Sequence, residues 1–261
     1  MIGLSSCTRA YYLNPFNANS QNHHAIPLQS DTFRTATYVN CNLSVGGAND
    51  VLRDETIIFN TAVYRSHTFE MFNLYYGADL SLGNYNVMPY KGKGNGMDTA
   101  IINRLAGNKF TGSYGIDAGV NVVLPFAGGG EWRIVGLEAC VRNEFGDYLQ
   151  FRKRLPFEAA NVIDRNHVLV TLGLATDIIF RVKHHSSMGL KFALGKSIFM
   201  DKAQWAGTYI SQSYSRGDLY TPGYGYFTQT THFTIKRYTG FLQSNIGTQA
   251  FSFQMGMSYR L

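Results

Sequence analysis

The chain has 261 residues, of which 45% are hydrophobic and only 15% are charged. Soluble globular proteins usually carry about a quarter charged residues, so this composition excludes a disordered polymer and is unusual for a cytosolic enzyme. The 27 Gly, 17 Tyr and 18 Phe, against 6 Pro and 2 Trp, favour aromatic strands relieved by glycine over helices. No apolar run approaches the roughly 18 residues that a membrane helix needs. A β-barrel stays possible, because each of its strands shows lipid only every second side chain.

The net charge is +6, but the Lys and Arg residues are scattered through the chain and form no stripe. This distribution argues against nucleic acid as a partner. The three cysteines, Cys7, Cys41 and Cys140, include no CxxC pair and have no histidine at the spacing of a metal site. We therefore expect no disulfide framework, no metal and no cofactor.

The amino terminus resembles the end of a bacterial lipoprotein signal, because the small residues Ser5 and Ser6 follow Leu4 and precede Cys7. We therefore predict a lipid on Cys7 and treat residues 1–6 as a residual signal-like segment. The apolar stretch of a complete secretory signal is missing, so an unmodified thiol is the alternative. The residues after Cys7 lack the acidic cluster that resembles a surface-export tag, and the amino terminus is therefore expected in the periplasm.

Residues 7–31 are rich in Asn, Ser, His and Pro without sustained periodicity, which predicts a periplasmic linker. From residue 32 to residue 261 the pattern changes to an alternation of apolar and polar residues, which is typical of strands with two unlike faces. We predict ten such strands, the eighth and ninth of them weaker, at residues 33–45, 56–65, 69–82, 114–124, 133–143, 167–183, 188–198, 205–213, 233–246 and 251–261.

The connections between these strands alternate in length. Short turns follow several strands, whereas long loops lie near residues 83–111 and 146–166, the first with a helical turn predicted at 98–105 and Asp98 as its N-cap. Outer-membrane barrels show this asymmetry, with short periplasmic turns and long external loops. The predicted fold is all-β: a single transmembrane antiparallel up-and-down β-barrel of about ten strands, with eight as the alternative.

The last strand carries a further signal. Its outer positions are apolar or aromatic up to the final residue, and Gln254, Gly256, Tyr259 and Leu261 resemble the β-signal that the barrel-assembly machinery recognises in bacterial outer-membrane proteins. The chain departs from that signal by ending in Leu261, where phenylalanine is commoner. The resemblance implies the outer membrane as location and the assembly machinery as a partner during insertion.

A looser resemblance covers more of the chain. The elements that carry it are Cys7, then Tyr11-Tyr12-x-Asn14-Pro15, then Pro27-Leu28 ahead of Asp31-x-Phe33, together with the final hairpin. They are similar to the head of uncharacterised lipid-anchored outer-membrane barrels of Bacteroidetes. The resemblance implies a location and a fold and carries over no active-site residue.

The polar faces of the strands are expected to fill the barrel. A barrel of eight to ten strands is too narrow for an open pore, so interior charges need partners. We predict a polar network inside the barrel that includes Asp79, Asp117, Glu138, Arg142, Asp177, Arg181, Lys191 and Arg260.

Other candidate catalytic, metal and phosphate sites in the chain are weaker. Asp164 and His167 lie at the start of a strand, as a hydrolase at the barrel rim would need, but no nucleophile accompanies them. The pairs His23-His24 and His184-His185 are weak metal candidates, because adjacent side chains on a strand point to opposite faces. A glycine-rich basic loop at 91–96 lacks the spacing of a nucleotide site and suits lipopolysaccharide phosphates better.

By elimination we predict a structural or accessory subunit of a larger envelope complex for secretion, assembly or uptake, and not an enzyme. The expected partners are outer-membrane lipid, lipopolysaccharide and other outer-membrane proteins. A stand-alone narrow solute transporter and a rim-sited outer-membrane hydrolase are the alternatives.

Overall fold

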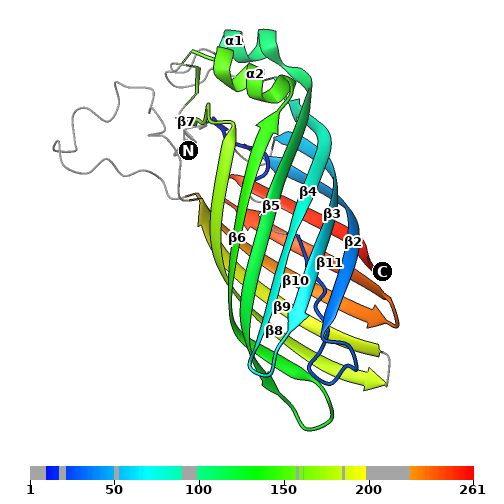
Figure 1. Cartoon of the computed structure of the whole chain (residues 1–261). Helices are drawn as coiled ribbons and strands as arrows, with labels where there is room; N and C mark the ends of the chain where they lie inside the picture. The colour runs from blue at the N-terminus through cyan, green and yellow to red at the C-terminus, as the bar shows by residue number, and fades with distance from the viewer. Residues whose placement is uncertain are drawn as a thin grey trace, which may run out of the picture.

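A computed structural model describes residues 10–17, 22–49, 53–89, 99–156, 159–160, 162–183, 186–197 and 224–261. The chain forms a closed antiparallel barrel of ten strands (Figure 1). In chain order these are β2 (Thr35–Ala48), β3 (Asp54–Thr68), β4 (Phe72–Val87), β5 (Gly107–Pro125), β6 (Glu131–Phe145), β8 (Val168–Lys183), β9 (Ser186–Ser197), β10 (Gly225–Ile235), β11 (Tyr238–Gly247) and β12 (Ala250–Arg260).

Each barrel strand pairs with its neighbours in the chain, and β12 pairs with β2 to close the sheet. The two ends of the barrel differ. At one end, which we call the short-turn end, tight turns join β3 to β4, β5 to β6 and β10 to β11, and the end of β8 pairs with the start of β9. The opposite long-loop end carries α1 (Thr99–Leu105), α2 (Asp147–Arg154) and a small parallel pair of β1 (Tyr11–Tyr12) with β7 (Val162–Ile163). Neither helix is long and apolar enough to span a bilayer.

The predicted fold class is confirmed, and so is the strand number. One strand lies elsewhere than expected: β10 begins at Gly225, whereas the strand predicted at 205–213 falls outside the described residues. The region 233–246 was predicted as one strand and is a hairpin, because the turn at Lys236 and Arg237 separates β10 from β11. Threonine on both faces of β10 weakens its alternation, which is the physical reason for the error.

The two faces of the barrel wall are chemically opposite. Outward side chains are apolar and exposed, for example Leu174 at 59%, Phe180 at 60% and Met255 at 65%. Inward side chains are polar and buried, and they include Asn40, Asn60 and most of the interior charges. A soluble protein rarely exposes so continuous an apolar surface, whereas a transmembrane barrel presents such a band to lipid.

The two described cysteines follow the same alternation. Cys41 is exposed on the outer face, Cys140 is buried on the inner face, and both are free thiols. The wall also makes room for large interior rings: a Cβ at Gly119 would lie 2.4 Å from Cε1 of Tyr75. Glycine at this position therefore lets the Tyr75 ring lie close against the backbone of the neighbouring strand.

We expect Leu174→Arg to lower the free energy of unfolding from lipid vesicles by about 2–4 kcal/mol, because it puts a charge on the lipid face near the bilayer midplane. Asp177→Asn, on the same strand but facing inward, is expected to leave membrane insertion intact. Urea titration of both variants in lipid vesicles makes the comparison. Wild type that stays folded and monodisperse in detergent-free buffer would contradict the membrane orientation of this face.

Candidate functional site

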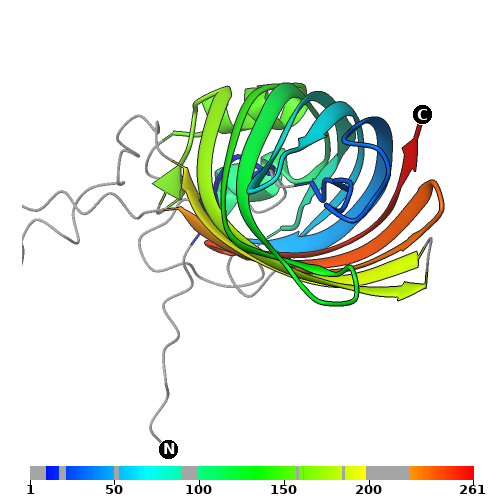
Figure 2. The same ribbon diagram turned by 60° about the horizontal axis from the view of Figure 1, so that its bottom comes forward.

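The interior of the barrel is filled by the chain's own amino-terminal part. We call residues 10–17 and 22–33 the lumen segment. It begins at the long-loop end, runs through the barrel and reaches the short-turn end, where β2 starts (Figure 2). Residues 10–17 and 22–28 are buried throughout. The described part of the expected periplasmic linker is therefore the filling of the barrel.

At the long-loop end the lumen segment is held by backbone pairing and by an apolar cluster. β1 pairs with β7 in parallel, and the Tyr148 hydroxyl donates to the carbonyl of Leu13 at 3.2 Å. Tyr12 packs edge-to-face on Phe151 of α2, with ring centroids 5.2 Å apart. The cluster around them is made of Ala10, Tyr12, Tyr85, Val87, Ile102, Tyr148, Phe151, Leu155, Ala159, Ala160 and Ile163. This small hydrophobic core covers the long-loop end.

Buried charges fix α2 above this cluster. Arg152 pairs with Glu144 and lies 3.5 Å from Asp164. Burial lowers the pKa of the Arg152 guanidinium, but the two carboxylates raise it more, so its pKa lies above the ordinary value. Asp164 also accepts a hydrogen bond from the backbone N–H of Asn166 at 2.9 Å. Arg152 is fully buried and charged. Its contacts with the carboxylates of Glu144 and Asp164 hold the loop that carries α2 and β7.

In the middle of the barrel two histidines of the lumen segment contact different walls. His24 lies 2.8 Å from Asp117 of β5 and stacks on Tyr75 of β4 at 4.2 Å between centroids. His23 stacks on His232 of β10 at 4.5 Å. Their neighbouring backbone is held as well, since the N–H of Ala25 donates to the Tyr64 hydroxyl at 2.7 Å. Within the described residues no group of three or more His, Cys, Asp or Glu is placed to hold a metal ion.

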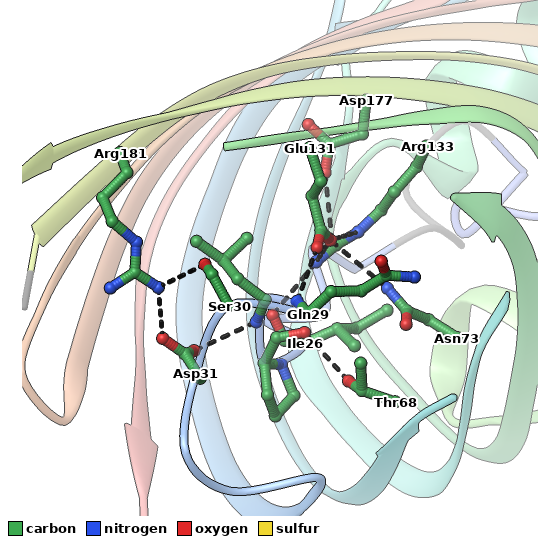
Figure 3. A network of polar contacts seen from close by, with 12 residues as sticks. Ile26, Gln29, Ser30, Asp31, Thr68, Asn73, Glu131, Arg133, Asp177 and Arg181 are labelled. Atoms are coloured by element: carbon green, nitrogen blue, oxygen red, sulfur yellow. Dashed lines mark hydrogen bonds and ion pairs between the residues drawn. The ribbon is translucent and has the colours of Figure 1, made fainter. Parts of the chain in front are cut away.

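Farther along the lumen segment, Arg133 of β6 is the centre of a network (Figure 3). Its guanidinium contacts Glu131 at 2.8 Å and Asp177 at 3.3 Å, and it donates to the carbonyl of Ile26 at 3.0 Å. Glu131 in turn accepts from the backbone N–H of Gln29 at 2.8 Å. One arginine therefore joins two strands of the wall to the segment inside it.

A β-bulge puts these groups inside the barrel. The pairing of β6 with β8 shifts register between Arg133 and Gly136. Strict alternation from Val135 and Leu137 would put Arg133 on the lipid face. The extra residue reverses the alternation, so Glu131 and Arg133 are buried and point inward.

The lumen segment is fastened again at the short-turn end. Arg181 of β8 pairs with Asp31 at 2.5 Å and donates to the Ser30 hydroxyl at 2.7 Å (Figure 3). The Ser30 hydroxyl donates to the carbonyl of Gly129 at 2.6 Å. Gly129 has φ +84, a left-handed conformation that favours glycine and that brings its carbonyl to this side of the turn between β5 and β6.

The predicted interior residues sort into pairs. Asp79 lies 3.1 Å from Arg142, Glu138 pairs with Lys191, and Asp177 lies 3.1 Å from His232. Arg181 lies at the rim and not deep in the barrel. Arg260 is also at the rim, with its guanidinium carbon 3.8 Å from the centroid of the Phe33 ring.

The residues of the β-signal resemblance lie along β12 and just beyond it. Gln254 is buried in the lumen, and Tyr259 lies beside Tyr238 with ring centroids 5.0 Å apart. A Cβ at Gly256 would lie 2.4 Å from the Cβ of Asn42, so β12 and β2 approach closely there. Leu261 is 68% exposed. Cys7 and the pair His184-His185 fall outside the described residues.

No protein-family model and no curated protein matches the chain. Among solved structures it is similar to the beta domain of the Bordetella autotransporter Brka, with 10% identity over 87% of this chain and 99% of that chain and a TM-score of 0.44. It is similar to the transport unit of the autotransporter AIDA-I from Escherichia coli, with 10% identity over 93% of this chain and 96% of that chain and a TM-score of 0.40. It is also similar to the KdgM porin, with 8% identity over 85% of this chain and 98% of that chain and a TM-score of 0.28. None of these likenesses assigns a function to this chain.

We expect Arg133→Ala to destabilise the barrel by about 3–5 kcal/mol, because it leaves buried carboxylates without their guanidinium partner. The measurement is urea unfolding in lipid vesicles, followed by tryptophan fluorescence. Arg65→Ala is the matched control, since Arg65 is exposed on the outer face of β3 toward the same end. Equal stability losses in the two variants would show that the network around Arg133 does not hold the lumen segment.

Proposed function

We propose that the chain is a bacterial outer-membrane β-barrel with a closed lumen that serves as a structural or accessory subunit of a larger envelope assembly. The observation that carries this proposal is the lumen segment, which is bonded to the wall from one end of the barrel to the other. Three contacts fasten it along its length: His24 to Asp117, the carbonyl of Ile26 to Arg133, and Asp31 to Arg181. A barrel whose lumen is filled and held in this way supports a structural role in the membrane. It does not support a role as an open diffusion channel.

A second observation supports the transporter alternative. Among the barrel strands, β2 alone continues directly from the lumen segment. The contacts of the segment along the described barrel wall are hydrogen bonds, ion pairs and apolar packing. A polar interior of Asn, Ser and Thr side chains would suit a solute if the segment left the lumen. No comparable observation favours a hydrolase, because the Asp164 carboxylate is engaged by Arg152 and by the backbone of Asn166.

The orientation in the membrane follows from the loops. We propose that the short-turn end faces the periplasm, as in other outer-membrane barrels. Ala10, whose carbonyl accepts a hydrogen bond from Val162 at the long-loop end, then lies on the external side. This orientation replaces the periplasmic amino terminus that we expected from the sequence.

Purified wild type in planar lipid bilayers is expected to show no stepwise conductance, because the lumen is filled. A variant that lacks residues 10–31 is expected to conduct, since the polar interior would then be open to ions.

Affinity purification of the tagged wild type from mildly solubilised membranes should recover a defined set of partners. Steady conductance by the wild type, or recovery of the barrel alone, would contradict the subunit proposal and favour the transporter.

The lipid anchor has its own test. We expect the intact mass of protein taken from native membranes to lack residues 1–6 and to include a diacyl or triacyl group at Cys7. A Cys7→Ser variant should lose that added mass and serves as the control. Native protein with an unmodified Cys7 thiol would contradict the anchor and leave the barrel proposal untouched.

A further inference from the structure

The short-turn end has a pocket that the lumen segment leaves open. Its volume is about 80 Å³, and its mouth is open to solvent. Its walls come from the end of the lumen segment, from β8 and from the turn between β10 and β11. Figure 2 views the barrel with this end turned toward the reader.

The charges around this pocket are unequal. Five cationic side chains line it, namely Arg133, Arg181, Lys236, Arg237 and Arg260, and Asp31 is the one carboxylate in its lining. Arg133 and Arg181 are already used by the lumen network, through Glu131, Asp177 and Asp31. Among the described residues, no carboxylate lies within 4 Å of the charged groups of Lys236, Arg237 or Arg260.

Two of these cations are neighbours in the sheet. The backbone N–H of Arg260 donates to the carbonyl of Arg237 at 2.9 Å. Arg260 is also oriented, because its guanidinium lies over the Phe33 ring at 3.8 Å and so stands at the wall of the pocket. The Arg260 side chain also hydrogen-bonds the Tyr38 hydroxyl, and a stacked guanidinium keeps further N–H groups at its edge available. Because the side chains of Arg237 and Arg260 line the same pocket, a bound anion would interact favourably with both charges.

One wall of the pocket is apolar. It includes Pro27, Leu28, Phe33 and Ile179, and hydroxyl and imidazole side chains make up much of the remaining lining. Planar guanidinium groups match carboxylate and phosphate oxygens in a bidentate way, and apolar walls favour a ligand that is more than a bare ion. We propose that this pocket binds an organic oxyanion: a molecule with one carboxylate or phosphate head group, held by Arg237 and Arg260, and an apolar body against Phe33 and Leu28.

The pocket lies at the short-turn end of the barrel and shares Arg133 and Arg181 with the lumen network. The inference stands whether or not the barrel is an accessory subunit. Both head groups belong to one chemistry, that of a flat or tetrahedral oxyanion bound by two arginines. Under the orientation proposed above, the pocket opens to the periplasm, where soluble organic anions can reach it. The lumen network lies behind it and separates it from the long-loop end.

The test uses the full chain in an uncharged detergent and isothermal titration calorimetry with four probes. Phenyl phosphate and phenylacetate are expected to bind saturably, inorganic phosphate more weakly, and the neutral 2-phenylethanol not at all. The variant Arg237→Gln/Arg260→Gln is expected to weaken binding of both organic anions by about tenfold or more, which corresponds to about 1.4 kcal/mol. The control Arg65→Gln, a cation on the outer face, should change the affinity by less than about twofold.

The result that overturns the proposal is equally defined. Absence of saturable binding to the wild type, equal binding of 2-phenylethanol, or equal weakening in Arg65→Gln would each reject the pocket as an oxyanion site. Heat-modifiable migration in gel electrophoresis verifies that each variant is folded before titration. If the double variant does not fold, the single variant Arg237→Gln replaces it, because Arg237 is an exposed turn residue, and it is judged by the same comparison with Arg65→Gln.

Discussion

The structure depends on the pairing of buried charges inside a narrow barrel. Ten strands enclose a space that side chains fill, and an ion left alone there costs several kcal/mol. The chain meets this constraint with its own amino-terminal segment, whose backbone and histidines contribute partners that the wall lacks. Arg133 shows the principle most directly, because it bonds two wall carboxylates and one carbonyl of the segment. The wall and its filling are therefore one electrostatic unit.

Much of the barrel could be predicted from the sequence, because its wall faces lipid on one side and polar groups on the other. Each strand therefore alternates apolar and polar residues with a period of two. β8 illustrates this, since Leu172 and Leu174 face outward and Asp177 faces inward. The signal fails where the outer face is not strongly apolar, as in β10 with Gln229 and Thr231. It also fails at a bulge, where Arg133 changes face without any change in composition.

The lumen segment was the least predictable part of the site. Its Asn, His and Pro residues have the composition of a solvated linker, and the same side chains suit the polar interior of a barrel. His24 and Asp117 lie far apart in the sequence, so only the closed sheet brings them together. By contrast, the need for partners around Asp117 and Asp177 was predictable, because a carboxylate on the inner face of so narrow a barrel requires a cation. The sequence did not indicate that a histidine lies against each of these two carboxylates.

The pairing of β12 with β2 has a consequence for how the molecule is made. The seam joins the last barrel strand, β12, to the first barrel strand, β2, and the lumen segment immediately precedes β2. Once the seam has formed, the middle of the segment, around His23 and His24, is surrounded by ten strands. The segment therefore enters a sheet that is still open at one side, or threads lengthwise through a finished ring. Biogenesis of the barrel therefore includes an ordering of two events, the entry of the lumen segment and the pairing of β12 with β2. This ordering follows from the position of the lumen segment directly ahead of Thr35.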